Sequence, residues 1–260
     1  MLSQLRRIVL GVAIGALLPC ATLGGNTQRP PEDALIAVAA NFAYVAEFLA
    51  DSFRTKGGCS VIVSSGSSGT LYAQIRHGAP FHAFLSADTL RVARLEQDGF
   101  VVPASRFTYA RGTLALWAPS ADAGDNPSAV LRHGSFRHLA IAMPSTAPYG
   151  AAAQQVLERM DVLEAVRSKI VRGENVTQAY QFIASGNAEL GFVAYSQVIE
   201  RPASQVWIVD EELYEPVLQQ AALLKSGSDN ICARTFLDYL HTDQAAMVIR
   251  RFGYATGADR

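Results

Sequence analysis

The fold is decided by a strand pattern that runs through a serine- and glycine-rich turn into a helical pattern, Ser60-Val61-Ile62-Val63-Ser64-Ser65-Gly66-Ser67-Ser68-Gly69-Thr70-Leu71-Tyr72-Ala73-Gln74-Ile75. The apolar run 60–64 predicts a strand, and the spacing of Leu71 and Ile75 predicts a helix. The turn suits an oxyanion, because its glycines let backbone N–H groups converge, its hydroxyls add donors, and the helix N-terminus carries partial positive charge. An ordinary capping loop explains the same composition equally well.

The same alternation of strand and helix extends in both directions along the chain. Further strands are predicted at residues 35–39, 83–86, 114–117, 139–143, 190–194 and 205–209. Between them lie stretches with apolar side chains three and four positions apart, such as residues 42–53 and 156–163. Strands alternating with helices predict an α/β protein with parallel sheets covered by helices on both faces.

Several predicted helices begin at a small or polar residue directly after a strand and end at a glycine. The expected starts are Asn41, Ser67 or Ser68, Asp88, the residue after 148–150, and 175–176; the expected ends are Gly78, Gly99 and Gly186. In a doubly wound sheet these turns open on the carboxyl edge, where ligands normally bind. The candidate site is therefore built from helix N-termini.

Composition excludes several classes of protein. The 260 residues suit one large or two medium domains, with 50% apolar and 17% charged residues. The 22 Lys and Arg against 23 Asp and Glu give a net charge of -1. Neither a disordered chain nor a dedicated nucleic-acid binder fits this balance. Three cysteines are too few for a disulfide scaffold or a four-cysteine zinc site.

The first 25 residues have the layout of a secretory signal. Arg6 and Arg7 precede the apolar run 8–18, and small residues follow. We expect cleavage between residues 21 and 26 and export to an extracytoplasmic space. Lipid attachment at Cys20 is disfavoured by Pro19, and an uncleaved anchor is the remaining alternative.

The remaining cysteines leave two interpretations open. An oxidising compartment permits a disulfide between Cys59 and Cys232. Two separate small apolar residues near element ends explain them equally well.

The sequence contains no complete catalytic or metal-binding motif of the following kinds. The turn fails as a nucleophile elbow, because Gly66 and Ser68 match but the second glycine would fall at Thr70. No Ser-x-x-Lys and no Gly-Lys pair occurs anywhere in the sequence. The five histidines lack zinc spacing, and we expect them to be solvated in loops. We therefore expect no catalysis and no cofactor.

Three segments, in this order along the sequence, resemble those of a known family. They are 39–42 (Ala-Ala-Asn-Phe), 65–75 from the turn above, and 78–88 (Gly-Ala-Pro-Phe-His-Ala-Phe-Leu-Ser-Ala-Asp). With Pro148-Tyr149-Gly150, 173–176, 191–196 and 251–254, the chain resembles the periplasmic molybdate-binding proteins of ABC transporters over essentially its whole mature length. The resemblance implies a monomer that captures molybdate or tungstate and delivers it to an ABC permease in the inner membrane, with no nucleic-acid partner.

The same resemblance implies a two-lobed periplasmic-binding-protein fold, in which each lobe is a mostly parallel sheet flanked by helices. Lobe 1 is expected at residues 32–111 plus 217–260, and lobe 2 at residues 112–216. Two crossover strands, around 113–118 and 217–224, are expected to form the hinge. Closure would bury the ligand between helix ends from both lobes.

The family's ligand positions fall on four residues of this sequence. Asn41 stands where many members have serine, and Ser68 comes from the Ser-Ser-Gly turn. Tyr149 stands where some relatives have alanine, and Val176 is expected to act through its backbone N–H. All four contact the oxygens of molybdate in this scheme, and none ligates the metal directly.

A fifth family contact departs from the pattern. The family's tyrosine aligns with Ala194, and Tyr195 is offset by one residue, which points its side chain to the opposite face. Ala40 or the Tyr149 hydroxyl is expected to supply the missing donor.

A cradle of uncharged donors selects a fully ionised anion. A protonated phosphate would turn an O–H donor toward other donors, which costs roughly 1 to 3 kcal/mol per unsatisfied group. Sulfate is also fully ionised, so only cavity size rejects it. A carrier for sulfate or another oxyanion, a secreted serine hydrolase using Ser67 or Ser68, and a structural or adhesion domain remain the alternatives.

Overall fold

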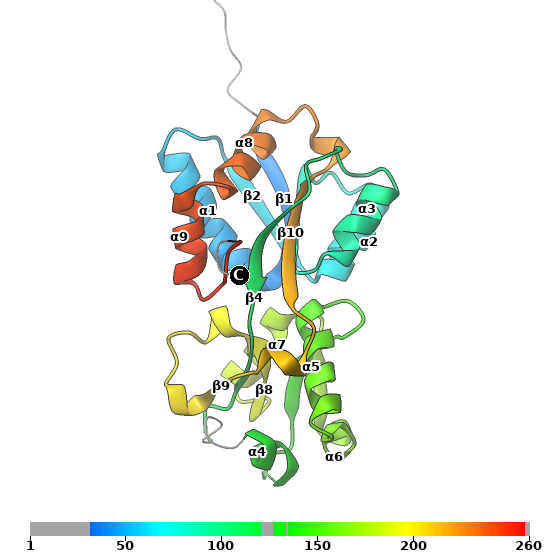
Figure 1. Cartoon of the computed structure of the whole chain (residues 1–260), viewed down its shortest axis with the longest axis vertical. Coiled ribbons are helices and arrows are strands. Elements are labelled where there is room, and N and C mark those ends of the chain that lie inside the picture. The colour runs from blue at the N-terminus through cyan, green and yellow to red at the C-terminus, as the bar shows by residue number, and fades with distance from the viewer. Residues whose placement is uncertain (1–31, 121–126, 134, 258–260) are drawn as a thin grey trace, which may run out of the picture. The chain divides into compact units, whose positions relative to one another are not determined.

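Two five-stranded sheets organise the chain (Figure 1). The computed structural model describes residues 32–120, 127–133 and 135–257. The first sheet has the order β2 (Val61–Gly66), β1 (Ala34–Ala39), β3 (Ala83–Ser86), β10 (Val217–Leu223) and β4 (Phe107–Gly112). The second has the order β7 (Ile170–Gly173), β6 (Leu139–Ala142), β8 (Leu190–Ala194), β5 (Leu114–Trp117) and β9 (Val206–Ile208).

The two sheets share one pattern of strand direction. In the first sheet β1 pairs parallel with β2 and β3, and β10 runs antiparallel between β3 and β4. In the second sheet β6 pairs parallel with β7 and β8, and β5 runs antiparallel between β8 and β9. One described strand in each sheet therefore opposes the other four, and the expected mostly parallel two-lobed fold is confirmed.

Helices cover both faces of the first sheet (Figure 1). One face packs under α1 (Ala43–Thr55), α8 (Ile231–Leu240) and α9 (Asp243–Arg251), around side chains such as Leu49 and Phe236. The other packs under α2 (Ser68–Arg76) and α3 (Leu90–Gln97), around Leu71 and Leu95. Single 3-10 turns lie at Ala40–Phe42 (η1) and Lys225–Gly227 (η6).

The second sheet is covered in the same way. α5 (Pro148–Arg159) packs on one face through Val156 and Leu157, and α7 (Val176–Ala184) packs on the other through Ile183. Shorter elements are α4 (Pro127–His133), α6 (Leu163–Val166), η2 (Arg167–Lys169), η3 (Tyr195–Gln197), η4 (Ala203–Gln205) and η5 (Glu211–Leu213). None of the helices in the described segments has the length and apolar character needed to span a bilayer.

The chain passes between the sheets twice. It leaves the first sheet at the end of β4 and enters the second at Leu114, and it returns into β10 at Val217. The crossover strands expected around 113–118 and 217–224 fall on β5 and β10, which begin where the chain passes between the sheets. β5 pairs within the second sheet and β10 within the first. The lobe boundaries at 111/112 and 216/217 stay a prediction, and the expected signal segment 1–25 lies outside the described residues.

Cys59 and Cys232 form a disulfide. It ties the residues just before β2 to the first turn of α8, across 173 positions of sequence. The alternative of two separate small residues is therefore wrong.

Candidate functional site

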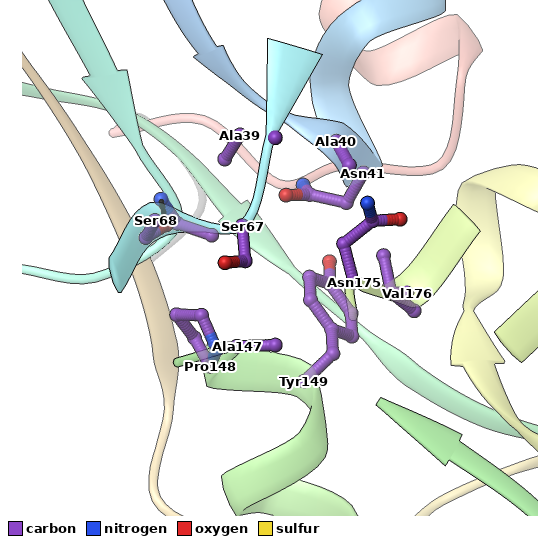
Figure 2. A pocket seen from close by; sticks show the side chains of 12 residues that line it. Ala39, Ala40, Asn41, Ser67, Ser68, Ala147, Pro148, Tyr149, Asn175 and Val176 are labelled. Atoms are coloured by element: carbon purple, nitrogen blue, oxygen red, sulfur yellow. Dashed lines mark hydrogen bonds between the residues drawn. The ribbon is translucent and has the colours of Figure 1, made fainter. Parts of the chain in front are cut away.

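A small cavity lies where helix starts from both sheets converge (Figure 2). About 10 Å³ of it can hold the centre of a water molecule, which is about the room that a single water needs. Its walls are Ala39, Ala40, Asn41, Gly66, Ser67, Ser68, Ala87, Ala147, Pro148, Tyr149, Asn175 and Val176. All five residues expected to bind the ligand are therefore brought together.

The start of α2 presents Ser68 to the cavity. Ser67 is the helix cap, because its Oγ accepts a hydrogen bond from Thr70 N–H at 3.3 Å. Ser68 is 1% exposed, and its Oγ accepts from Ala87 N–H at 3.0 Å. Since a hydroxyl has one proton, this accepted bond leaves the Ser68 proton available to a guest.

The start of α7 presents a backbone donor. Asn175 caps the helix, and its Oδ1 accepts from Gln178 N–H at 3.0 Å. Val176 is the first helical residue, so its N–H has no acceptor within the helix. This confirms the expected helix start at 175–176, and it makes the Val176 amide a donor at the positive end of the helix dipole.

The start of α5 places a buried phenol at the cavity. The helix begins at Pro148, so the expected start after residue 150 is wrong; proline needs no N–H partner in a first turn. Tyr149 is 2% exposed, and its buried hydroxyl oxygen has no hydrogen-bond partner within the part of the chain that the structure describes. Burial, reinforced by nearby Tyr254, raises the pKa of Tyr149 well above its ordinary value. The phenol therefore stays protonated and remains a donor.

Asn41 contributes differently from the expectation. Its side chain does not cap α1, because its Nδ2 donates to Gln219 Oε1 at 3.0 Å and to Tyr254 Oη at 3.2 Å. Both amide protons are thereby used within the protein. The N–H groups of Ala40 and Asn41 lie in the first turn of η1 and lack acceptors within it, so these backbone groups are the donors that η1 offers.

Ala194, at the fifth expected contact position, and the neighbouring Tyr195 both lie away from the cavity. Ala194 is buried at the end of β8, and its N–H donates to Gln197 Oε1 at 3.1 Å. Tyr195 is half-buried and faces the C-terminal segment, where a Cβ added to Gly253 would stand 2.9 Å from its ring. Neither side chain lines the cavity, which leaves the Ala40 amide and the Tyr149 hydroxyl as replacements.

Hydrogen bonds join the two sheets around the cavity. Gly69 N–H in α2 donates to Thr146 O, ahead of α5, at 2.8 Å. A Cβ on Gly69 would stand 2.8 Å from Thr146 Cα, so this close approach requires glycine. Thr177 Oγ1 in α7 donates to Ala40 O at 3.1 Å. These two hydrogen bonds therefore link the two lobes beside the cavity.

No residue of the cavity wall carries a charged side chain. The nearby Arg91 pairs with Asp88, whose Oδ1 also accepts Arg91 N–H at 2.8 Å in the first turn of α3. The cap position of α3 is Thr89, so the expected helix start at Asp88 is wrong by one residue. Among the described residues, no group of three His, Cys, Asp or Glu could hold a metal ion. Positive potential at the cavity therefore comes from four helix starts and from O–H dipoles.

Sequence reasoning missed the residues behind the cavity. Gln219 is fully buried in β10, and Tyr254 follows α9; together they hold Asn41. A signal was present, because Gln219 lies on the same strand face as the apolar residues Val217 and Ala221. His82 was also misjudged: its Nδ1 accepts Leu35 N–H at 3.0 Å, so it is not a solvated loop side chain.

Two α/β lobes with a small cavity lined by helix starts from both define a binding protein of the two-lobed class. The chain belongs to the bacterial extracellular solute-binding protein family, whose model matches residues 34–255.

Two relatives and one solved structure extend this similarity. The chain is 44% identical over 254 residues to a molybdate-binding protein ModA of Azotobacter vinelandii, covering 96% of this chain and 98% of that protein. It is 42% identical over 247 residues to the ModA of Rhodobacter capsulatus, covering 95% and 94%. The structure resembles the Azotobacter vinelandii periplasmic molybdate-binding protein with a TM-score of 0.80 and 39% identity, over 85% of this chain and 98% of that one.

Proposed function

We propose that this chain captures molybdate, or tungstate, in the cavity between the two sheets and delivers it to an ABC permease in the inner membrane. The observation that carries the proposal is the donor set: helix N-termini and hydroxyls from both sheets meet, and no charged side chain joins them. The names of the relatives at 44% and 42% identity support molybdate as the oxyanion.

The proposed contacts go to the anion's oxygens. Ser68 donates through its hydroxyl and its N–H, Val176 through its N–H, and Tyr149 through its hydroxyl. Ala40 and Asn41 donate through their backbone amides. Charge-assisted hydrogen bonds of this kind are about twice as strong as neutral ones, so several of them offset the lost hydration of a dianion.

The chemistry of these donors accounts for selection against phosphate. A protonated phosphate brings an O–H group, and the wall would meet it with N–H and O–H groups that cannot accept. A fully ionised metal-oxo dianion has only acceptors and incurs no such penalty. Sulfate is also a fully ionised dianion with only acceptor oxygens, so it differs from molybdate at this site by size alone.

We also propose that the protein works as a monomer in the periplasm. The Cys59–Cys232 disulfide fits an oxidising compartment. The expected secretory signal at residues 1–25 supplies the route of export, and no nucleic-acid partner is expected.

Binding without catalysis is part of the proposal. The cavity wall has no histidine, aspartate, glutamate or lysine that could activate a serine. Ser67 Oγ is 2.7 Å from Thr70 Oγ1, and Ser68 Oγ is held by Ala87 N–H. The serine-hydrolase alternative therefore lacks a base, and a resident cofactor lacks ligands.

A thermal-shift panel of extensively dialysed protein with molybdate, tungstate, sulfate and phosphate tests the proposal. Molybdate at 100 times its Kd is expected to stabilise the fold by about 2.7 kcal/mol, with tungstate similar and phosphate without effect. Stabilisation by sulfate alone would establish the sulfate-carrier alternative. No shift with any of the four anions would refute oxyanion binding.

A further inference from the structure

A buried amide lies directly behind the cavity. Gln219 is 0% exposed in β10, at the point where the pairing register of β10 with β4 shifts. Its Oε1 accepts hydrogen bonds from Asn41 Nδ2 and from Tyr109 Oη, both at 3.0 Å. Two donors on one oxygen fix which end of the amide is carbonyl and which is NH₂.

The NH₂ end of this amide faces Tyr149. A Cβ built on Gly112 would stand 2.7 Å from Gln219 Nε2 and 2.0 Å from the Tyr149 hydroxyl oxygen, so the two atoms border the same small space. Both atoms are buried, and neither has a partner that meets hydrogen-bond geometry among the described residues. The Gln219 side chain nevertheless acts on Tyr149 as a hydrogen-bonding neighbour, which lowers the Tyr149 pKa against the larger raising effect of burial. Buried polar groups without partners are rare in folded proteins, and two that adjoin each other point to a shared task.

The proton count shows what the pair can do. A phenol has one proton to donate, and its oxygen can also accept. When Gln219 Nε2 donates to the Tyr149 oxygen, the phenolic proton is free for another acceptor. Figure 2 shows the Tyr149 oxygen directed toward the middle of the residues that line the cavity.

We propose that Gln219 is a positioning residue of the anion site: its amide NH₂ donates to the Tyr149 hydroxyl oxygen and so directs the phenolic proton at the bound oxyanion. The proposal rests on the proposed function and adds to it a residue that does not touch the ligand. It also explains why a glutamine stands in an apolar strand, since the residue must accept on one side and donate on the other.

The neighbours of this pair do not titrate near neutral pH. Around Tyr149 and Gln219 the described titratable groups are Tyr109 on β4, Tyr214 before β10, and Tyr254 after α9. Burial raises the pKa of each of these phenols. A carboxyl introduced at position 219 would be the group that changes charge, and burial would raise its pKa as well.

The first test is a double-mutant cycle measured by calorimetric titration with molybdate. Gln219→Met keeps the volume and removes both the NH₂ donor and the oxygen that accepts from Asn41 and Tyr109. Tyr149→Phe removes the hydroxyl and keeps the ring. Each is expected to raise the Kd about 10- to 100-fold, the range for a hydrogen bond to a charged group. If Gln219 acts through Tyr149, the double variant binds within about threefold of Tyr149→Phe. Gln220→Met, at the next position of β10, is the matched control and should bind as the wild type does.

The second test uses Gln219→Glu across pH 8 to pH 5.5, with the wild type in parallel. At pH 8 the carboxylate introduced at position 219 accepts the hydrogen bond of the Tyr149 O–H, which is then no longer available to the anion. The affinity for molybdate therefore falls. As pH drops and the carboxyl becomes neutral, it regains an O–H donor, and affinity recovers toward the wild-type value at the same pH.

Each outcome decides one question. Additive effects in the cycle, or a Gln219→Met protein with wild-type affinity, would overturn the proposal. If Gln219→Met does not fold, the Gln219→Glu series decides: loss with recovery supports the proposal, and loss without recovery contradicts it. A wild type that binds no molybdate would refute the proposed function rather than the role of Gln219.

Discussion

Replacing Ser68 by alanine removes one hydroxyl from the cavity wall and leaves the backbone of α2 in place. In the unliganded protein the loss orphans Ala87 N–H, which Ser68 Oγ accepts at 3.0 Å, and so destabilises the fold by about 1–3 kcal/mol. In the complex the protein also loses a charge-assisted bond to the dianion, worth about 1.5–3 kcal/mol. The Kd for molybdate is therefore expected to rise about 10- to 100-fold.

Ser86→Ala is the matched control. Ser86 is also a fully buried serine whose Oγ accepts a backbone N–H, that of Asp88 at 3.3 Å, but it does not line the cavity. Both variants should lose comparable stability without ligand, and only Ser68→Ala should lose affinity. The assays are calorimetric titration and urea unfolding with and without molybdate.

The magnitude is large enough to see in unfolding alone. At a molybdate concentration of 100 times the wild-type Kd, the ligand stabilises the wild type by about 2.7 kcal/mol. A 100-fold weaker variant at the same concentration gains only about 0.4 kcal/mol. Equal losses of affinity in Ser68→Ala and Ser86→Ala would refute the reasoning, because the effect would then come from general loosening.

Three further predictions follow from the fold and its buried groups. Gly112→Ala places a methyl 2.0 Å from the Tyr149 hydroxyl, so it should cost about 1–3 kcal/mol in urea unfolding and weaken molybdate binding; wild-type behaviour would show that the phenol moves freely. Breaking the disulfide by joint Cys59→Ala and Cys232→Ala changes should lower stability by about 2–5 kcal/mol, and reductant should then have no further effect on the melting temperature. Burial raises the pKa of Tyr254 to about 12, above its value of about 10 in the unfolded chain. The stability that this shift contributes is therefore complete below about pH 10 and is lost as the pH rises from about 10 through about 12. Tyr254→Phe should make the free energy of unfolding fall less steeply over this alkaline range, as measured by urea unfolding at a series of pH values.

The elements that periodicity could predict are those with apolar runs or clear caps. The strands at residues 83–86, 114–117 and 190–194 were predicted with their bounds, because each is buried on both faces and reads as an apolar run. The strands at residues 107–112 and 170–173 were missed, since exposed and half-buried positions interrupt the apolar signal. Pairing across the sheet, which sequence pattern does not show, decides those two.

The site was predictable as far as backbone donors at helix starts, and not beyond. Ser68 and Val176 are found where the turn and cap signals put them, because capping chemistry is local. The hydrogen bonds of the Asn41 side chain to Gln219 and Tyr254 could not be predicted, because these partners lie 178 and 213 positions away in the sequence. Long-range contacts of buried polar groups depend on how β10 and the C-terminal segment pack, which local patterns do not encode.

The central claim is that a metal-oxo dianion occupies the cavity between the two sheets. Crystals of the dialysed protein grown with molybdate, with diffraction collected on both sides of the molybdenum absorption edge, test it most directly. The account predicts a single anomalous peak within the cavity, with the four surrounding oxygens reached by Ser68, Tyr149 and the amides of Asn41 and Val176. A peak on the protein surface, or no peak at a concentration that saturates binding in solution, would contradict it.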